Sequence, residues 1–147
     1  MPSTVWPDAQ DALKAALDAR PGLTGVPVTV GYPAGGPNVE HIWIAGQVTD
    51  WTREWETTAV ANAPIREEFT LELYVVVSRR VRTFEEVRVR LLAILDEIEA
   101  AVTADFTLGG AVAVATLTGG EIQEGIDDER RSGGAELRVR CEADLAG

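Results

Sequence analysis

One long alternating run of residues in the middle of the chain, Arg66–Ser78, constrains the fold more than any other feature. Its apolar side chains recur at every second position: Phe69, Leu71, Leu73, Val75 and Val77. This is the period of a β-strand with one buried face. At about 3.3 Å per residue the strand would be roughly 40 Å long, whereas a compact domain of this size has a radius of gyration of about 15 Å. The strand must therefore cross the whole domain, and it can project from it.

Two segments have the pattern of amphipathic helices. The helix that begins after Thr83 has this residue as its N-cap, with Glu86 three positions on. Its apolar stripe comprises Phe84, Val87, Leu91, Ile94, Leu95, Ile98 and Val102. An earlier helix is predicted over Asp8–Arg20, with Pro7 just ahead of it and Pro21-Gly22 as its stop signal. Both helices have one apolar face, so both are expected to pack on a sheet.

The remaining pattern predicts further strands, and their order defines the fold class. They are Val26–Val30, Glu40–Val48, Trp51–Thr58 (a strand or the arm of a hairpin, ended by Asn62–Pro64), Ala111–Thr118 (which Glu121–Ile126 can continue) and Ala135–Ala143. The polar segment Asp127–Gly134 is predicted to be a hairpin loop or a mobile segment. We therefore expect an α+β fold of order α-β-β-β-(β)-α-β-β, with a mainly antiparallel sheet and two helices packed on one face. Without repeats or a long linker, residues 1–147 are expected to form a single domain.

The charge balance indicates which partners the chain avoids. It has 24 acidic and 13 basic residues, a formal net charge of −11 and a pI near 4.5. A body this acidic repels phosphate backbones, so binding to nucleic acid by charge neutralisation is not expected. No apolar run approaches the about 20 residues that span a bilayer, and the N-terminus lacks the pattern of a secretory signal. We expect a protein assembled in the cytoplasm, with no membrane partner.

The residues that could carry chemistry do not form a catalytic pattern. His41 lies beside Ile42 and Trp43 without a nucleophile or second histidine nearby, which favours a structural role. Cys141 falls on the apolar face of the last strand, as a buried thiol would. Because the chain has one cysteine and one histidine, a zinc site or an internal disulfide is not expected. The acidic run Asp127–Glu129 lacks the spacing of a calcium loop. We therefore predict no catalytic, cofactor or metal site.

Three groups of residues are candidates for protein interfaces. Trp51, Arg53 and Trp55 lie at alternate positions, and Trp and Arg are frequent at interface hot spots, although core packing also explains the tryptophans. A basic cluster on an acidic chain suggests docking to an acidic surface, or else a solvated turn; its members are Arg79, Arg80 and Arg82. The third group is the polar segment with Asp127, Asp128, Arg130 and Arg131. We expect the Thr49–Pro64 and Asp127–Gly134 segments to face partners and to become ordered mainly on assembly.

Several segments in this order resemble a known family. They are the helix end Ala-Leu-Asp-Ala-Arg-Pro-Gly-Leu, Val26–Pro33, Glu40–Ile44, Arg66–Val77, the helix from Thr83, and Leu137–Cys141. Together they are similar to the tail terminator proteins of long-tailed bacteriophages, also called minor tail or tail completion proteins. The resemblance implies a structural virion protein located in the tail or neck. Such subunits form a ring, typically a hexamer, that caps the tail tube, stops its polymerisation and provides the surface on which the head docks.

The implied partners are further copies of the chain, the tail tube protein and the head–tail connector or neck proteins, while DNA passes through without specific binding. The family brings no catalytic residues. Three alternatives remain open: another neck component, such as a head–tail joining or head-completion protein; a small enzyme that uses His41 or the acidic loop; and a monomeric acidic inhibitor or immunity protein. If the chain forms a ring, we expect a net acidic channel wall, because inward-facing basic residues would bind the phosphates of passing DNA.

Overall fold

The computed structural model describes residues 4–36, 39–57, 62–81, 83–127 and 130–145, without the side chains of residues 56, 57, 62–65 and 127. The elements in chain order are α1 (Trp6–Asp18), the 3-10 turn η1 (Pro21–Leu23), β1 (Val28–Val30), β2 (Glu40–Ile44), β3 (Thr49–Thr57), β4 (Asn62–Arg79), α2 (Phe84–Ala104), β5 (Val114–Asp127) and β6 (Arg130–Asp144). The predicted α+β class and the order of helices and strands, including the optional fourth strand, are confirmed.

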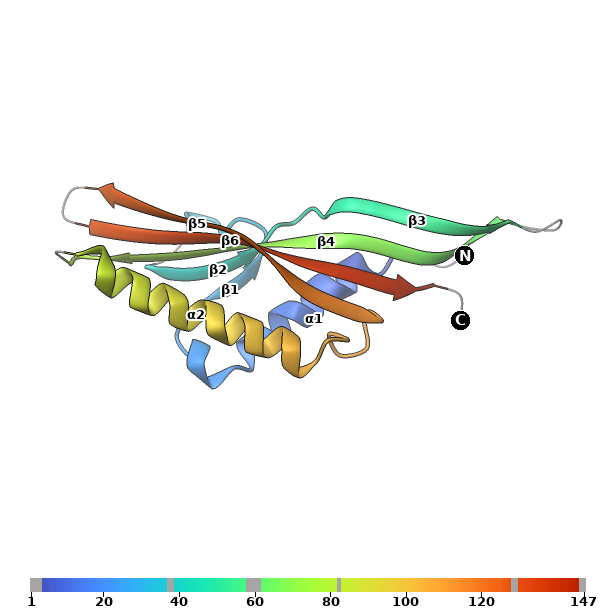
Figure 1. Ribbon diagram of the computed structural model, residues 1–147, viewed down its shortest axis with the longest axis horizontal. Coiled ribbons are helices and arrows are strands. Elements are labelled where there is room, and N and C mark those ends of the chain that lie inside the picture. Colours follow the sequence, from blue (N-terminus) through green and yellow to red (C-terminus); the bar gives the residue numbers. More distant parts are fainter. Residues whose placement is uncertain (1–3, 37–38, 58–61, 82, 128–129, 146–147) are drawn as a thin grey trace.

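The sheet is organised around the long strand β4, as the alternating run predicts. Five of its six strands follow the order β1-β2-β4-β6-β5, and the sixth, β3, pairs with β4 off this path. On one edge of β4 lie first β3, beside residues 62–70, and then β2, beside residues 73–77; the other edge pairs with β6. All pairings are antiparallel except that of β1 with β2. β4 is 18 residues long, and its N-terminal part, paired with β3, extends beyond the helices (Figure 1).

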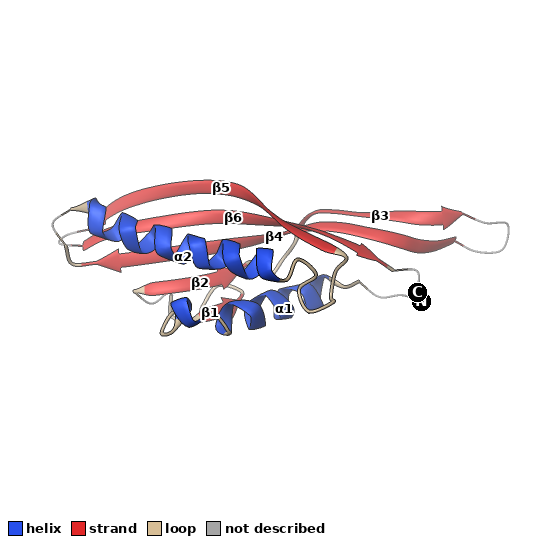
Figure 2. Cartoon of the chain, turned by 60° about the horizontal axis from the view of Figure 1, so that its bottom comes forward, coloured by secondary structure: helices blue, strands red, loops and turns tan. Residues whose placement is uncertain are grey.

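Both helices cover one face of the sheet, where the core lies (Figure 2). The predicted face of β4 is buried: Phe69, Leu71, Leu73 and Val77 are 0% exposed. The α2 stripe packs against it through Val87, Leu91, Ile94 and Ile98, which are also fully buried. A Cβ at Gly133 would lie 2.9 Å from Cγ1 of Val87 and 3.2 Å from Cδ2 of Leu91. The absence of a side chain at this position therefore lets α2 lie close to β6.

A β-bulge interrupts β5, where the pairing with β6 shifts between Leu117 and Gly119. The next residue, Gly120, has a φ of +158°, and a Cβ there would collide with the carbonyl oxygen of Glu136. Only glycine fits such a close approach of two strands. Beyond the bulge β5 continues to Asp127, so the predicted continuation over Glu121–Ile126 is confirmed.

Several predicted boundaries are wrong, and two of the errors matter for the surface. The expected break at Asn62–Pro64 lies inside β4, because a register shift opposite Glu54 and Trp55 accommodates Pro64 in the ladder. The expected loop over Asp127–Gly134 is mostly strand, because β6 begins at Arg130 and its glycines pair with β4 and β5 on both sides. In addition, α1 begins at Trp6, which places Pro7 in its first turn, where proline is favoured. The strands β1, β2 and β5 are displaced from their predicted ends by a few residues.

Candidate interaction surfaces

We call β3 and residues 62–70 of β4 the arm; its outer part extends beyond the helices (Figure 1). At its base the carboxylate of Glu67 is 0% exposed and accepts four hydrogen bonds. The donors are Thr4 Oγ1 at 2.7 Å, the Val5 amide at 3.0 Å, Trp51 Nε1 at 3.1 Å and Arg53 Nε at 3.0 Å. A buried carboxylate is stable only when it is paired and hydrogen-bonded in this way. Glu67 therefore fastens β3 and the start of the chain to β4.

This network changes the interpretation of the tryptophan group. Trp51 and Arg53 both bind Glu67, and the Arg53 guanidinium also lies 5.1 Å from the centroid of the Trp51 ring. Burial alone would raise the pKa of Glu67, but the hydrogen bonds from Thr4, Val5, Arg53 and Trp51 outweigh it and lower the pKa below 4.5. Trp55, in contrast, is 47% exposed and makes no hydrogen bond or ring contact with the described residues. Of this group, Trp55 has the side chain most available to a partner.

The arginines predicted as two separate groups lie together at the opposite end of the sheet. The ladder pairs Arg79 with Arg131 and Ser78 with Ser132. Arg130 donates from Nε to Ser78 Oγ and from Nη2 to the Ser78 carbonyl oxygen, each at 3.0 Å. We call Arg79, Arg80, Arg130 and Arg131 the basic end. Arg82 and Asp128 lie outside the described residues, as does the side chain of Asp127.

The arginines of the basic end differ in whether a carboxylate of the same chain already pairs with them. Arg79 donates to Glu40 Oε1 at 3.3 Å, and the same carboxylate pairs with Arg90 of α2 at 2.7 Å. Glu40 therefore already neutralises part of this charge. Arg80 is exposed, and it has no hydrogen bond or ion pair with another described residue. Arg80 is thus the member best placed to meet an acidic partner.

Opposite the helices, the sheet carries an aromatic cluster that the sequence pattern does not identify. The rings of Trp43 and Tyr74 stack at 5.3 Å, and Tyr32 meets Trp43 edge-on at 5.4 Å. Next to it, His41 is 3% exposed with Nε2 3.1 Å from Thr29 Oγ1. Burial lowers the pKa of His41 below 6.5. The histidine therefore packs as a neutral ring, in agreement with its predicted structural role.

The other candidate for chemistry, Cys141, is also part of the core. It is 0% exposed, and burial raises the pKa of its thiol to about 12. A thiol with this pKa stays protonated at neutral pH, so it is a poor nucleophile. This agrees with the prediction of a buried thiol.

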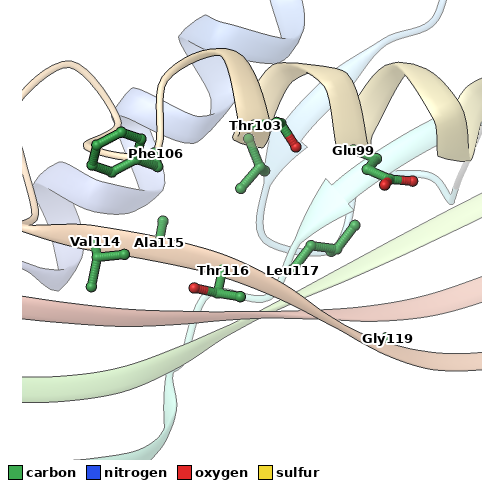
Figure 3. A pocket seen from close by; sticks show the side chains of 9 residues that line it. Glu99, Thr103, Phe106, Val114, Ala115, Thr116, Leu117 and Gly119 are labelled. Carbon is green, nitrogen blue, oxygen red and sulfur yellow. The ribbon is translucent and has the colours of Figure 1, made fainter.

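A groove of about 500 Å³ separates the C-terminal half of α2 from the first half of β5 (Figure 3). Its lining is Glu99, Val102, Thr103, Phe106, Val114, Ala115, Thr116, Leu117 and Gly119. Glu99 contributes the one ionisable side chain to this lining. Phe106 is 55% exposed at one end, and just beyond the groove along β5 Ile122 is 59% exposed. We call this feature the α2–β5 groove; it results from the packing of two distant elements, so the sequence pattern could not reveal it.

Neither a cluster of metal-ligating side chains nor a membrane-spanning helix is found in the part of the chain that the structure describes. It contains no group of three or more His, Cys, Asp or Glu side chains that could hold a metal ion. None of its helices is long and apolar enough to cross a membrane.

Comparison with known proteins assigns no family to this chain. No protein family matches the chain, and no curated protein sequence matches it. Among solved structures, the chain is similar to one from the "Virion of native gene transfer agent (GTA) particle", with a TM-score of 0.43 and 12% sequence identity over 91% of this chain and 94% of that chain. A likeness of this degree carries no argument about function.

Proposed function

We propose that this chain is a structural subunit of a phage-type virion, and that it acts as the tail terminator. In this role several copies, expected to be six, close a ring on the tail tube, stop its growth and present a surface to the head connector. The chain performs no catalytic step and needs no cofactor. DNA passes through the ring without being bound.

The observation that carries the proposal is the arm. The hairpin extends beyond the helices, and a buried carboxylate with four hydrogen-bond donors fixes its orientation. Such a projecting and oriented hairpin is expected in a subunit that contacts a neighbour, and less so in a monomer. In an assembly such an arm reaches a neighbour in a fixed direction. The order of segments that resembles tail terminators, described above, supports the choice of this class.

The charge distribution is consistent with a conduit for DNA. A net charge of −11 disfavours the adhesion of phosphate backbones to the channel. The same charge makes copies repel one another, although salt at about 0.15 M screens this repulsion beyond roughly 8 Å. Contacts between subunits therefore need local pairs of arginine and carboxylate. We propose the basic end as one such contact, with a copy of the chain or with the tail tube or connector.

Deletion of the gene for this chain from the genome that encodes the particle tests this function. Electron microscopy is expected to show tail tubes of abnormal length, because nothing stops their polymerisation. Tails of normal length that fail to join heads would instead indicate a neck or head-completion protein. Normal particles would contradict both roles and favour the acidic inhibitor.

A substitution at the basic end tests the role of this surface. Arg80→Glu is expected to leave the subunit folded but to reduce the fraction of capped tails, because it places a carboxylate where an acidic partner would dock. Lys14→Glu is the control: it also reverses one exposed charge, but on α1, where Lys14 pairs with Asp18. Equal effects of the two variants would argue that overall charge, and not this surface, matters.

A further inference from the structure

We propose that the copies join through their sheets: β3 of one copy pairs antiparallel with the free edge of β5 in the next, and Trp55 enters the α2–β5 groove. This inference rests on the proposed function, since it assumes self-assembly, and it adds the surfaces that meet. The partner that pairs with β5 and fills the α2–β5 groove is a second copy of this chain.

Both strands have an unpaired edge. Over the described residues β5 pairs with β6 alone, and β3 pairs with β4 alone. The Ala115 amide is capped by the Phe106 carbonyl oxygen at 2.6 Å, so the edge of β5 is open from Thr116 onward. An open edge presents backbone donors and acceptors that another strand can satisfy.

The topology makes the two edges complementary in position and direction. Residues 66–70 of β4 pair with β3 on one edge and with β6 on the other, so β3 and β5 lie on opposite sides of the sheet. The strand β3 runs antiparallel to β4, β4 to β6, and β6 to β5. It follows that β3 is antiparallel to β5. A second copy placed beside the first with its helices on the same side therefore brings β3 to β5 in antiparallel order. This contact is head-to-tail, the type that can close a ring.

The same arrangement places Trp55 on the correct face. Arg53 and Trp51 reach Glu67, which lies on the buried, helix-covered face of β4. The register shift between Glu54 and Trp55 places its extra residue in β4, because β4 advances by two residues there and β3 by one. The alternation along β3 is therefore kept, and Trp55, two residues beyond Arg53, lies on this side as well. The α2–β5 groove is on the same side, since α2 covers that face. A groove of about 500 Å³ with a mostly apolar lining has room for the half-exposed indole ring.

The charges favour one part of the β5 edge. From Val114 to Gly120 the strand has no ionisable side chain and no proline, so it lacks two common devices that protect free edges. Further along, Glu121 and Glu124 would repel an acidic strand. Pairing is therefore expected before and around the bulge and not at the distal end.

A pair of opposite charges also favours this register. Arg138 is exposed, lies opposite Gly119 and forms no ion pair with another described residue. Because Gly119 has no side chain, the guanidinium can reach past the edge of β5. On β3 the exposed Glu54 lies opposite Arg66, on the face of the sheet that Arg138 shares. In the paired copies, Glu54 of one can meet Arg138 of the other.

Cross-linking between single-cysteine variants tests the pairing. Thr52→Cys on β3 and Glu121→Cys on β5 both replace exposed residues, and they lie opposite each other when Glu54 lies opposite Gly119. The native Cys141 is buried and unreactive. With a short bismaleimide, a mixture of the two variants is expected to give linked dimers, and each variant alone is expected to give almost none. Linked dimers from either variant alone would show a symmetric contact and overturn the proposal.

The contribution of the indole ring is tested by association. Sedimentation of the wild-type chain is expected to show concentration-dependent assembly, and Trp55→Ala is expected to weaken it about tenfold or more, as loss of a hot-spot residue does. Val89→Ala is the control, because Val89 is 63% exposed on α2, away from the groove. An equal effect of both variants would overturn the role of Trp55.

The outcomes separate this inference from the proposed function. A chain that assembles without mixed cross-links overturns the β3–β5 pairing but leaves the ring intact as a proposal. A chain that stays monomeric at every concentration contradicts the pairing, and the tail lengths of the deletion mutant then decide the function independently.

Discussion

The body and the arm of this molecule are held together by different forces. In the body, β4 is covered by α2, and side chains such as Leu73 and Leu91 are fully buried in one apolar cluster. In the arm, β3 is joined to β4 by the ladder and by the two hydrogen bonds that Trp51 and Arg53 donate to Glu67, while Trp51 and Trp55 remain about half exposed. Apolar burial is strong but non-directional, whereas hydrogen bonds to a buried carboxylate fix an orientation.

The difference suggests a division of labour. The body supplies the stability of the fold, and the network at Glu67 sets the direction of an element that extends toward a partner. Substitutions in the body should therefore unfold the whole chain, and those in the network should loosen the arm and leave α2 unchanged.

The largest effect is expected from a cavity in the body. Leu91→Ala should lower the free energy of unfolding by about 2–5 kcal/mol, because the side chain is fully buried between α2 and β6. Its neighbour Leu92 is 46% exposed, so Leu92→Ala should change stability by about 0.5 kcal/mol or less. Urea unfolding followed by circular dichroism measures both. Similar losses for the two variants would contradict the position of the core.

A smaller and local effect is expected at the base of the arm. Glu67→Gln keeps the shape but weakens a buried acceptor, at a cost of about 1–3 kcal/mol. Hydrogen exchange should accelerate in β3 and near Val5, with little change in α2. The control is Glu68→Gln, which removes partly exposed ion pairs with Arg66 and Arg140 and should cost about 0–1 kcal/mol. Equal acceleration in α2 and β3 would show that the arm is not an independent unit.

Acid should act on the arm through the same carboxylate. Because the pKa of Glu67 in the folded chain is below 4.5, the unfolded chain binds its proton first as the pH falls. The contribution of Glu67 to stability is thus complete above pH 4.5 and is lost as the pH falls through the folded pKa. The stability difference between wild type and Glu67→Gln should shrink in that range. A difference that is constant with pH would contradict the ionised state of Glu67.

The smallest effect concerns His41 in the body. Burial holds its folded pKa below 6.5, so the unfolded chain is protonated first when the pH falls below this value, and stability declines. His41→Gln should lack this decline. Because the chain has one histidine, the comparison of the two pH profiles between pH 7 and 5 isolates it. Identical slopes would show that His41 is not buried as a neutral ring.

The parts of the fold that could be predicted from sequence are those with a local signal. The alternation in β4 and the stripe of α2 are periodic within one element, so both were identified. The ends of the hairpins were not, because Pro64 and Gly133 are accommodated by pairing and packing with distant residues. Local propensity cannot report such compensation.

The candidate site shows the same limit. The exposed tryptophans and the arginines were recognisable by type, but their grouping depends on the register that brings Arg79 to Arg131. Glu67 was missed, although its place two residues before Phe69 puts a charge on the buried face of β4 and is the signal that could have identified it. The α2–β5 groove has no counterpart in the sequence.

A reconstruction of the assembled chain by electron cryomicroscopy would show directly how the copies meet. We predict a closed ring of copies related by rotation, with β3 of each on the β5 edge of the next and a net acidic channel wall. A symmetric dimer with no channel, or a ring whose channel is lined by basic residues, would contradict this prediction.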